Sequence, residues 1–409
     1  MAKKKISTNN SWVNIFDTYK ILADIKSTGF SDITADQIKA VDGKEARLMT
    51  KVDFRENLPT IMSDEGLSIL AIKNGLYRIA KNDPFIDINE KIATKIIDIP
   101  TPKNLISIDP FNIKSESGAL DIAHISKMCE ETFEEETELS IRGRLRGQLD
   151  FNIDRTPYHI DGVQIEVDGG YEGNNNIHLI EAKIGFRNNI NIRQLLYPQL
   201  YWEKEIKKVK EIKSYVFYLH NDIFRFIPYI YDGKIGYADH SEEKAFRFIE
   251  PTSKFSIYDI TINESLIDNS VPFPQADKFE KIQDMLFVVY KSDCINKYEL
   301  SLEFDIVSRQ IDYYFNVLKW LKVCKEEDEC LVLTETGKKI IELPFRKRIE
   351  ELAKIVFSHP ITNNYLHNKP ISNVLFAKYR MNSESTQRRR LQTINAWISY
   401  FKSIFEEKN

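Results

Sequence analysis

Hydrophobic and polar residues alternate in several runs through the middle of the chain. A period of two is typical of β-strands, because successive side chains of a strand point to opposite faces. We therefore expect strands at 145–153, 163–167, 177–184, 215–219 and 224–231. A helical pattern precedes them at 118–133 and interrupts them at 192–209, where Pro198 forces a kink or a late start. This order predicts an α/β domain at 106–285 with one mixed central sheet.

The first 105 residues mix a helical stripe at 12–25 with shorter strand-like runs. Pro100 and Pro102 then interrupt both helix and sheet, which marks a boundary. We expect residues 1–105 to form an N-terminal α/β accessory domain.

The last part of the chain, 286–409, has a different pattern. A strongly amphipathic stretch at 304–321 predicts a helix, a short strand follows at 330–334, and a further helix is expected at 338–343. Helix, hairpin and helix in this order are the arrangement of a winged helix, so we expect a C-terminal winged-helix and basic helical domain for DNA binding.

Charge is nearly balanced over the 409 residues, with 57 Lys and Arg against 61 Asp and Glu and a net charge of −4. A uniformly basic protein is excluded, so any surface for a polyanion requires positive residues gathered on one face. Residues 361–409 show such a gathering, with eight Lys and Arg against three Glu.

Four cysteines match no paired zinc-binding pattern, and we expect them to be reduced thiols. No apolar run approaches the ~18–20 residues that span a bilayer, and the basic start is not followed by the apolar segment of a secretory signal. These patterns predict a soluble, cytoplasmic protein without a membrane partner.

Residues 163–185 carry the candidate chemistry. Gln164, Glu166 and Asp168 share one strand face, and Ile177, Leu179, Glu181 and Lys183 share a face of the next strand. Glycine and asparagine residues between the runs predict an antiparallel hairpin. A turn near 171–173 would bring Glu166 or Asp168 within one or two rungs of Glu181, with Glu166 the nearer.

Crowded carboxylates repel one another unless a cation lies between them. Oxygen ligands of this kind suit Mg²⁺, and Lys183 would lie beside the ion, where it can orient a water or offset charge on a phosphate. A glutamate and a lysine two residues apart on a strand are also common as an exposed ion pair. The apolar residues that flank Glu181 favour the catalytic interpretation, because charged groups are rare in buried strands.

The acidic residue, the turn and Glu181-Ala182-Lys183 on the following strand resemble the PD-(D/E)xK nuclease fold of type II restriction endonucleases. The resemblance implies that Glu181, the carbonyl of Ala182 and an acidic residue of the preceding strand bind Mg²⁺, and that Lys183 is catalytic. The first acidic ligand stays open because the chain has no Pro-Asp dipeptide. Asp168 and Glu166 are the leading candidates, before Asp150 and Asp161.

Several other residues are candidates for contacts to DNA. Arginines at alternate positions of one strand share a face and would contact phosphates. Two residues at the start of a helix would lie near the scissile phosphate. Two segments of the C-terminal domain would bind the duplex. These residues are Arg142, Arg144, Arg146, Arg193, Gln194, Ser308, Arg309, Gln310, Arg388, Arg389 and Arg390. Glu116 is expected to complement a helix dipole or to support the metal through a water.

The sequence thus predicts a type II restriction endonuclease that cleaves double-stranded DNA at a short sequence with Mg²⁺. A homodimer and a functional partnership with a cognate DNA methyltransferase would accompany that activity. Two alternatives remain: a sequence-specific DNA-binding regulator on an inactive nuclease fold, and a structure-selective repair nuclease.

Overall fold

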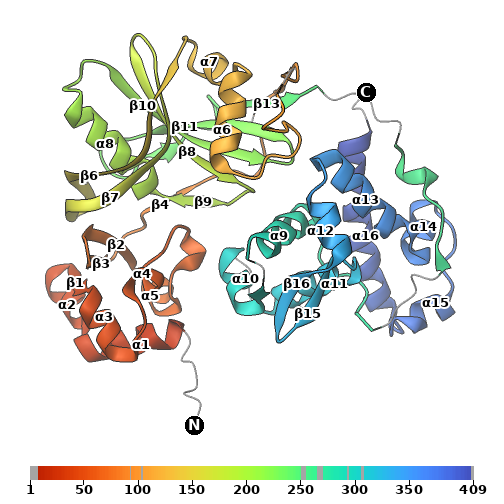
Figure 1. Ribbon diagram of the computed structural model, residues 1–409. Helices are drawn as coiled ribbons and strands as arrows, with labels where there is room; N and C mark the ends of the chain where they lie inside the picture. Colours follow the sequence, from red (N-terminus) through yellow and green to blue (C-terminus); the bar gives the residue numbers. More distant parts are fainter. Residues whose placement is uncertain are drawn as a thin grey trace. The chain divides into compact units, whose positions relative to one another are not determined.

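The computed structural model describes residues 8–92, 94–102, 105–249, 255–264, 270–292, 294–304 and 308–406. The chain divides into two compact units (Figure 1). Unit 1 comprises Met1–Pro102 and Lys114–Phe248, and unit 2 comprises Lys103–Ile113 and Ile249–Asn409. The prediction of a mixed α/β protein with a mixed central sheet is confirmed.

Eleven strands in the described part of unit 1 form one sheet, in the order β1-β3-β2-β7-β8-β10-β11-β13-β5, with β6 beside β7 and β12 beside β11. A separate two-stranded sheet pairs β4 with β9. The strands are β1 (Phe30–Thr34), β2 (Ser68–Lys73), β3 (Leu76–Ala80), β4 (Phe85–Asp87), β5 (Ile96–Ile99), β6 (Glu138–Ile153), β7 (Thr156–Glu172), β8 (Asn176–Ile184), β9 (Asn189–Asn191), β10 (Glu211–His220), β11 (Ile223–Ile230), β12 (Tyr237–Ala238) and β13 (Lys244–Phe248).

All five predicted central strands are present, and two of them are much longer than expected. β6 and β7 have 16 and 17 residues. They continue through Gly143 and Gly162, whose φ values of 117° and 70° favour glycine and occur where the pairing of β6 with β7 is irregular. Such glycines interrupt the alternation of side chains, so the sequence pattern shows only part of each strand.

The helices of unit 1 also differ in detail from the expected ones. They are α1 (Thr8–Tyr19), α2 (Ile21–Thr28), α3 (Ala35–Asp42), α4 (Ala46–Met49), α5 (Thr60–Glu65), α6 (Glu116–Ile125), α7 (Met128–Phe133) and α8 (Leu196–Glu205), with 3-10 turns η1 (Arg55–Asn57) and η2 (Ile192–Gln194). The helix expected at 118–133 is two helices, because Lys127 adopts a left-handed conformation with φ 64°. α8 starts late, which places Pro198 in its first turn where no hydrogen bond is lost.

α7 and α8 cover opposite faces of the central sheet. The ring of Phe133 in α7 packs 5.2 Å from that of Tyr215 on β10. Tyr197 of α8 packs in a core that includes Val216, the next residue of β10. Because successive residues of a strand point to opposite faces, the two helices enclose the sheet between them.

The N-terminal residues extend this sheet. β2 and β3 form an antiparallel hairpin, and Lys73 of β2 lies opposite Asp161 of β7 in a parallel pairing. An ion pair of 3.1 Å joins the two side chains. Helices α1 to α5 bury Trp12, Ile15 and their neighbours in a core of their own beside these strands.

Unit 2 is mostly helical and carries a small sheet in the order β14-β16-β15. Its elements are η3 (Ile257–Asp259), α9 (Phe279–Ser292), β14 (Ile295–Asn296), α10 (Lys297–Glu303), α11 (Ser308–Trp320), β15 (Cys324–Glu327), β16 (Cys330–Leu333), α12 (Glu335–Ile341), α13 (Phe345–Ser358), α14 (Pro360–Leu366), α15 (Asn373–Lys378) and α16 (Glu384–Phe405). α12 begins before the expected residue 338 because the hydroxyl of Thr334 caps it. Among the described helices of the chain, none is both long enough and apolar enough to cross a bilayer.

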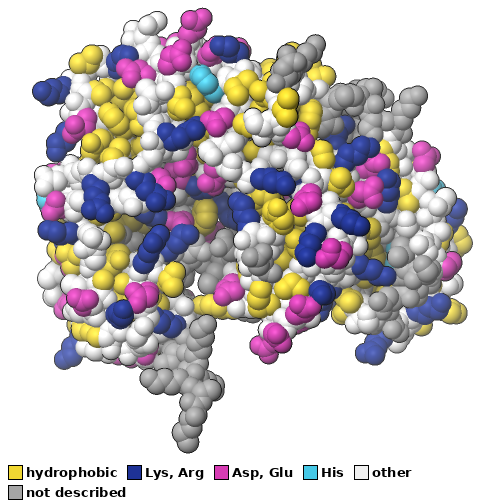
Figure 2. Space-filling view, in the orientation of Figure 1, with side chains coloured by type: hydrophobic (Ala, Val, Ile, Leu, Met, Phe, Trp, Pro, Cys, Tyr) yellow, Lys and Arg dark blue, Asp and Glu magenta, His cyan; other side chains and the backbone are white. Residues whose placement is uncertain are grey.

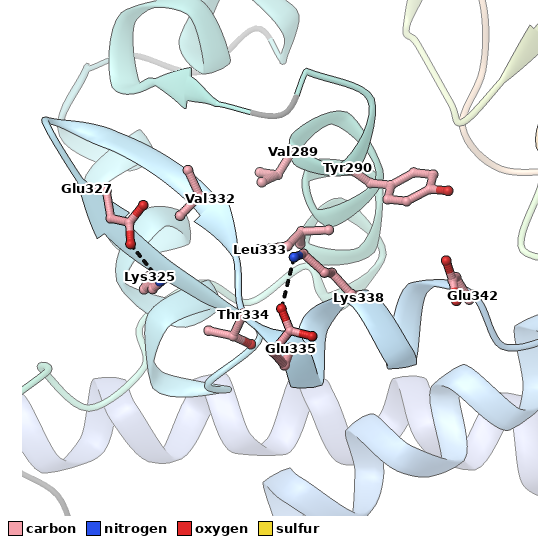
Figure 3. Close-up of a pocket in the computed structure, with 10 residues that line it drawn as sticks. All are labelled: Val289, Tyr290, Lys325, Glu327, Val332, Leu333, Thr334, Glu335, Lys338 and Glu342. Carbon is pink, nitrogen blue, oxygen red and sulfur yellow. Dashed lines mark hydrogen bonds and ion pairs between the residues drawn. The ribbon is translucent and has the colours of Figure 1, made fainter.

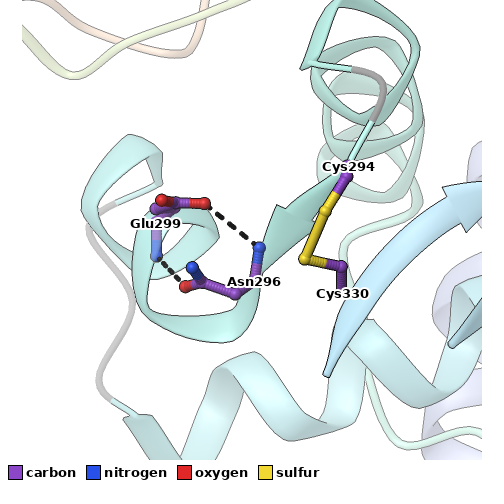
Figure 4. The surroundings of a disulfide bond; sticks show 4 residues. All are labelled: Cys294, Asn296, Glu299 and Cys330. Carbon is purple, nitrogen blue, oxygen red and sulfur yellow. Dashed lines mark hydrogen bonds between the residues drawn. A yellow bond between two sulfur atoms is a disulfide. The ribbon is translucent and has the colours of Figure 1, made fainter. Parts of the chain in front are cut away.

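A disulfide bond joins Cys294 to Cys330 in unit 2 (Figure 4). It connects the residue before β14 to the first residue of β16, and the neighbouring Asn296 and Glu299 form a capping box at the start of α10. The expectation that all four cysteines are reduced is therefore wrong for this pair. Cys129 and Cys324 are free and buried. The Cα atoms of the bonded pair are 5.5 Å apart across the sheet, and the sequence spacing gave no sign of that proximity.

Candidate active site

The hairpin of β7 and β8 forms the centre of the candidate site. Its register runs from the pair Glu172–Ile177 to the pair Gly169–Ile180. The predicted antiparallel hairpin is confirmed, but the turn lies at 173–175, further along the chain than expected. The paired part of the hairpin ends directly after Asp168, and both Glu166 and Glu181 line a small hollow beside Gln194.

Two glycines explain why the turn was misplaced. Gly169 and Gly170 looked like turn residues, but both lie within β7 and pair with β8. A Cβ atom at Gly170 would lie 2.6 Å from the Cβ of Ile141 on β6. The glycine is required by the close approach of the neighbouring strand rather than by a turn.

Glu135, which follows α7, holds the true turn in place. Its carboxylate accepts hydrogen bonds from the side chains of Asn176 at 2.6 Å and His178 at 2.8 Å, and from the backbone N–H of Asn175 at 3.3 Å. Partial burial opposes ionisation of Glu135, but these hydrogen bonds lower its pKa below the usual value. The sequence analysis missed this residue, whose one available signal was its place in an acidic stretch directly before the strands.

Asp168 lies where the two strands of the hairpin separate. Its Oδ2 atom accepts a hydrogen bond of 2.9 Å from the backbone N–H of Ala182. Its own carbonyl oxygen accepts one of 3.1 Å from Arg142 on β6. One hydrogen bond thus holds the Asp168 carboxylate and another holds its backbone, next to the segment that carries Glu181 and Lys183.

The ammonium group of Lys183 lies between two oxygen atoms of its own strand. Its Nζ donates to Oε1 of Glu181 and, at 3.1 Å, to the carbonyl oxygen of Ala182. The side chains of Glu181 and Lys183 are only 6% and 14% exposed, so this pair is almost removed from water. A cation therefore lies between the same two oxygen atoms that the nuclease resemblance implies as metal ligands.

Burial and crowding change the ionisation of this pair. Burial, together with repulsion from Asp168 and Glu116, raises the pKa of Glu181 to about 8, although Lys183 acts in the opposite direction. Burial alone would lower the pKa of Lys183, but attraction to Glu181, Glu116 and Asp168 outweighs it and raises this pKa. Lys183 therefore stays cationic, and Glu181 is harder to ionise than an exposed glutamate unless a further cation approaches.

Gln194, at the end of η2, completes the surroundings of Glu181. Its Nε2 atom donates a hydrogen bond of 2.5 Å to Oε1 of Glu181. Arg193, the preceding residue, instead forms an ion pair with Asp53. Of these two predicted DNA contacts, the structure brings Gln194 to the site.

Glu166 and the three arginines of β6 lie beside the site on the more exposed part of the hairpin. Arg144 and Glu166 are cross-strand neighbours joined at 3.0 Å, with side chains 65% and 50% exposed. Arg142 pairs with Asp121 of α6 at 2.7 Å, and Arg146 is exposed. Lys and Arg side chains gather over this part of unit 1 on the face that Figure 2 shows.

The donor set suits a hard divalent cation better than a transition metal. Asp168, Glu181 and the Ala182 carbonyl supply only oxygen atoms, as Mg²⁺ prefers. Three or more His, Cys, Asp or Glu side chains do not converge into a metal cage anywhere in the described residues. Mg²⁺ in nucleic-acid enzymes commonly takes one or two carboxylates with waters and phosphate oxygens, so two carboxylates and a carbonyl fit that pattern.

The predicted DNA contacts of unit 2 lie on two helices. Arg388 and Arg389 of α16 are exposed, whereas burial and the neighbouring Arg389 lower the pKa of Arg390. Gln310 is exposed near the start of α11. Ser308 and Arg309 begin this helix, and their side chains lie outside the described residues.

Unit 2 also contains a hollow of about 510 Å³ between α9, the β15–β16 hairpin and α12 (Figure 3). Four of its charged lining residues form two ion pairs, Lys325 with Glu327 at 2.5 Å and Lys338 with Glu335 at 2.9 Å, and Glu342 also lines it. The second pair raises the pKa of Lys338 and lowers that of Glu335, which leaves both groups charged.

Three protein-family models match consecutive parts of the chain. The chain is similar to a domain of unknown function (DUF6996) at residues 9–79, to a second (DUF6997) at 80–249 and to a third (DUF7226) at 281–406. No curated protein and no solved structure matches. The candidate site lies wholly within residues 80–249, so the segment similar to the second family carries the chemistry described above.

Proposed function

We propose that this protein is a Mg²⁺-dependent endodeoxyribonuclease of the PD-(D/E)xK type that acts as a type II restriction enzyme. The observation that carries the proposal is the position of the Lys183 ammonium between Glu181 and the Ala182 carbonyl, with Asp168 fixed beside them. A buried lysine, two carboxylates and a carbonyl oxygen at the opening of a hairpin are the groups that phosphodiester hydrolysis requires.

Each group has a role in this proposal. Asp168, Glu181 and the carbonyl of Ala182 would hold Mg²⁺, which when bound polarises phosphate oxygens and favours ionisation of water. The ammonium of Lys183 orients the attacking water and stabilises the negative charge that develops on phosphorus. As the water oxygen bonds to phosphorus, the bond to the 3′ oxygen breaks, which leaves a 5′-phosphate and a 3′-hydroxyl. Gln194 keeps Glu181 oriented through its hydrogen bond.

DNA binding would be shared between the two units. The order α9, β14, α10, α11, β15 and β16, with a three-stranded sheet, supports a winged-helix assignment for this part of unit 2. α11 would then present Ser308, Arg309 and Gln310 to the major groove. Arg388–Arg390 of α16, and Arg144 and Arg146 of β6, would contact phosphates.

The biological setting follows from the reaction. An enzyme that cuts unmodified DNA in its own cell requires protection of the host sites, so we propose a cytoplasmic location and a cognate DNA methyltransferase as functional partner. Cutting both strands of a palindrome calls for two active sites, which supports a homodimer.

The test is digestion of unmethylated plasmid by the full chain with Mg²⁺ and with EDTA, followed by sequencing of the ends. We expect a fixed set of fragments with 5′-phosphate ends in Mg²⁺ and intact plasmid in EDTA. Asp168→Asn should reduce the cleavage rate at least about 100-fold, because the metal loses a charged ligand. The matched control is Asp161→Asn on the same strand, whose side chain pairs with Lys73 away from the site.

Other outcomes point to the two alternative functions. Specific DNA binding without cleavage in Mg²⁺ or Mn²⁺ would identify a regulator on an inactive nuclease fold and overturn the proposal. Cleavage of branched DNA alone, without fixed fragments from plasmid, would identify a structure-selective repair nuclease.

A further inference from the structure

The loop at 188–194 connects β8 to α8 and carries Gln194 to the site. Two of its asparagines, Asn189 and Asn191, are each only 1% exposed. A buried amide without hydrogen-bond partners destabilises the fold, so the partners of these two side chains determine where the loop can lie.

Those partners come from the 52–56 segment, in the part of the chain that precedes the nuclease-like region. Asn189 accepts a hydrogen bond of 2.7 Å from the backbone N–H of Arg55 and donates one of 2.6 Å to the side chain of Glu56. The amide group of Asn191 donates at 3.0 Å to the carbonyl oxygen of Val52. Both buried amides are therefore satisfied by the 52–56 segment.

Asp53 contacts the loop in two further ways. Its carbonyl oxygen accepts a hydrogen bond of 3.1 Å from the backbone N–H of Asn191. Its carboxylate forms an ion pair with Arg193, the residue directly before Gln194. The oxygen of the Asn191 side chain also accepts from the backbone N–H of Arg193 at 3.1 Å and so caps η2.

The other side of the loop is held by the β4 strand. Phe85–Asp87 pairs with Asn189–Asn191, and the backbone N–H of Ile192 donates to the carbonyl oxygen of Pro84 at 2.8 Å. The loop thus lies between two segments that both come from the first 90 residues. Its last residue, Gln194, then reaches Glu181.

We propose that the 52–56 segment is a positioning element of the active site, which sets Gln194, and through it Glu181, by way of Asn189, Asn191 and Arg193. This inference rests on the proposed function and adds a role for the N-terminal part of the chain. Asn191, Arg193 and Asp53 are positioning residues, since none of them touches the reacting atoms. Changes near residue 53 should therefore reach the reaction through Gln194 alone.

The first test does not depend on cleavage. Asp53→Asn removes the ion pair to Arg193 and keeps every backbone hydrogen bond, and Asn191→Ala removes the buried amide as a larger change. The control is Asp32→Asn, which breaks a comparable ion pair to Arg78 on the other side of the N-terminal strands. We expect amide hydrogen exchange at 189–195 to accelerate about tenfold in Asp53→Asn and not in the control. Equal exchange in both would overturn the proposal.

The second test is a double-mutant cycle on cleavage of plasmid in Mg²⁺. Gln194→Ala is expected to lower kcat about tenfold and Asp53→Asn about fivefold, with KM unchanged. The double variant should be no slower than Gln194→Ala, because the first change acts through the second residue. Rates that multiply would show that Asp53 acts on general stability instead, and would sink the idea.

The two tests separate this inference from the proposed function. A wild-type chain that cuts no DNA while Asp53→Asn still loosens 189–195 would refute the nuclease and retain the positioning contact. Normal cleavage by the wild-type chain, with amide exchange at 189–195 unchanged in Asp53→Asn, would support the nuclease and refute the positioning contact. Thermal unfolding of each variant identifies any that fails to fold, in which case the milder Asp53→Asn decides.

Discussion

Two strands of this protein carry a glutamate and a lysine two residues apart, and they place them in opposite surroundings. On β8, Glu181 and Lys183 form an ion pair with side chains 6% and 14% exposed. On β15, Lys325 and Glu327 form an ion pair with side chains 56% and 55% exposed. The spacing is the same, but on β8 burial raises the pKa of Glu181, and attraction to the nearby carboxylates raises the pKa of Lys183.

The neighbours of each strand explain the difference. β8 lies between β7 and β10 in the large sheet, with helices on both faces. β15 is the last strand of a three-stranded sheet and is open to water. An exposed pair contributes about 0–1 kcal/mol to stability, whereas a buried pair has to be retained for a reason other than stability. A glutamate and a lysine at this spacing therefore indicate a candidate active site only where both side chains are buried.

The largest expected effect is on catalysis. Lys183→Ala should reduce plasmid cleavage at least about 100-fold while DNA binding in Ca²⁺ changes little, because the ammonium stabilises charge in the transition state only. Lys325→Ala should leave the rate within about twofold. Rates and binding constants of the two variants, measured in parallel, decide the comparison. Full activity of Lys183→Ala would place the chemistry elsewhere.

The second effect is a dependence of cleavage on pH at limiting Mg²⁺. Because the pKa of Glu181 is raised to about 8, its carboxyl must lose a proton before it can bind a metal ion. The rate should rise about tenfold per pH unit below pH 8 and then level off, and saturating Mg²⁺ should flatten the rise. Single-turnover rates at several Mg²⁺ concentrations provide the measurement. A profile that is flat below pH 8 at low Mg²⁺ contradicts this role of Glu181.

The third effect concerns the stability of the fold at acidic pH, and it compares a buried histidine of unit 2 with an exposed histidine of unit 1. Burial lowers the pKa of His359 from 6.5 to about 4, and its ring accepts from Ile361 N–H and contacts the hydroxyl of Tyr379. The unfolded chain takes up a proton near pH 6.5 and the folded chain does not. The free energy of unfolding therefore contains a contribution from neutral His359 that is fully present above pH 6.5. It is lost as the pH falls toward 4, by about 3 kcal/mol in total.

Urea unfolding of wild type and His359→Asn across this pH range tests the assignment, since asparagine can still cap α14. The variant should lose less stability on acidification. The exposed His159, at 64% side-chain exposure, provides the control as His159→Asn. Parallel losses in wild type and His359→Asn would show that other groups control acid stability.

The smallest effect concerns exposed charges alone. Replacing Arg388 and Arg389 of α16 by alanine should weaken DNA binding about tenfold and lower the slope of log affinity against log salt by about 2, since each phosphate contact releases counterions. Titrations between low and moderate salt measure both quantities. An unchanged slope would remove α16 from the DNA-binding surface.

Much of the architecture was accessible from the sequence because it depends on local patterns. Alternation identified the five central strands. It also correctly assigned the alternate residues Ile177, Leu179, Glu181 and Lys183 of β8 to one face. Glu181 lies opposite Val216, which packs toward α8, as that assignment requires. The ends of the strands were harder to predict from the sequence. β6 and β7 continue through Gly143 and Gly162, where the local pattern suggests that a strand ends.

The details of the site depended on contacts that no local pattern contains. Gly170 resembled a turn residue, and only the nearness of Ile141 shows why a glycine is needed there. That error placed the turn too early in the chain, at 171–173 instead of 173–175. Glu135, Asn191 and the Cys294–Cys330 bond were missed for the same reason, because each joins segments that are distant in sequence.

The junction between the first two family matches falls at residue 80, the last residue of β3. β3 pairs with β2, and β2 in turn lies against β7, so one continuous ladder crosses the junction. A polypeptide that started at residue 80 would lack β2 and most of β3, and β7 would lose its pairing with β2 at Asp161. We expect such a fragment to be less stable than the full chain and more prone to aggregate.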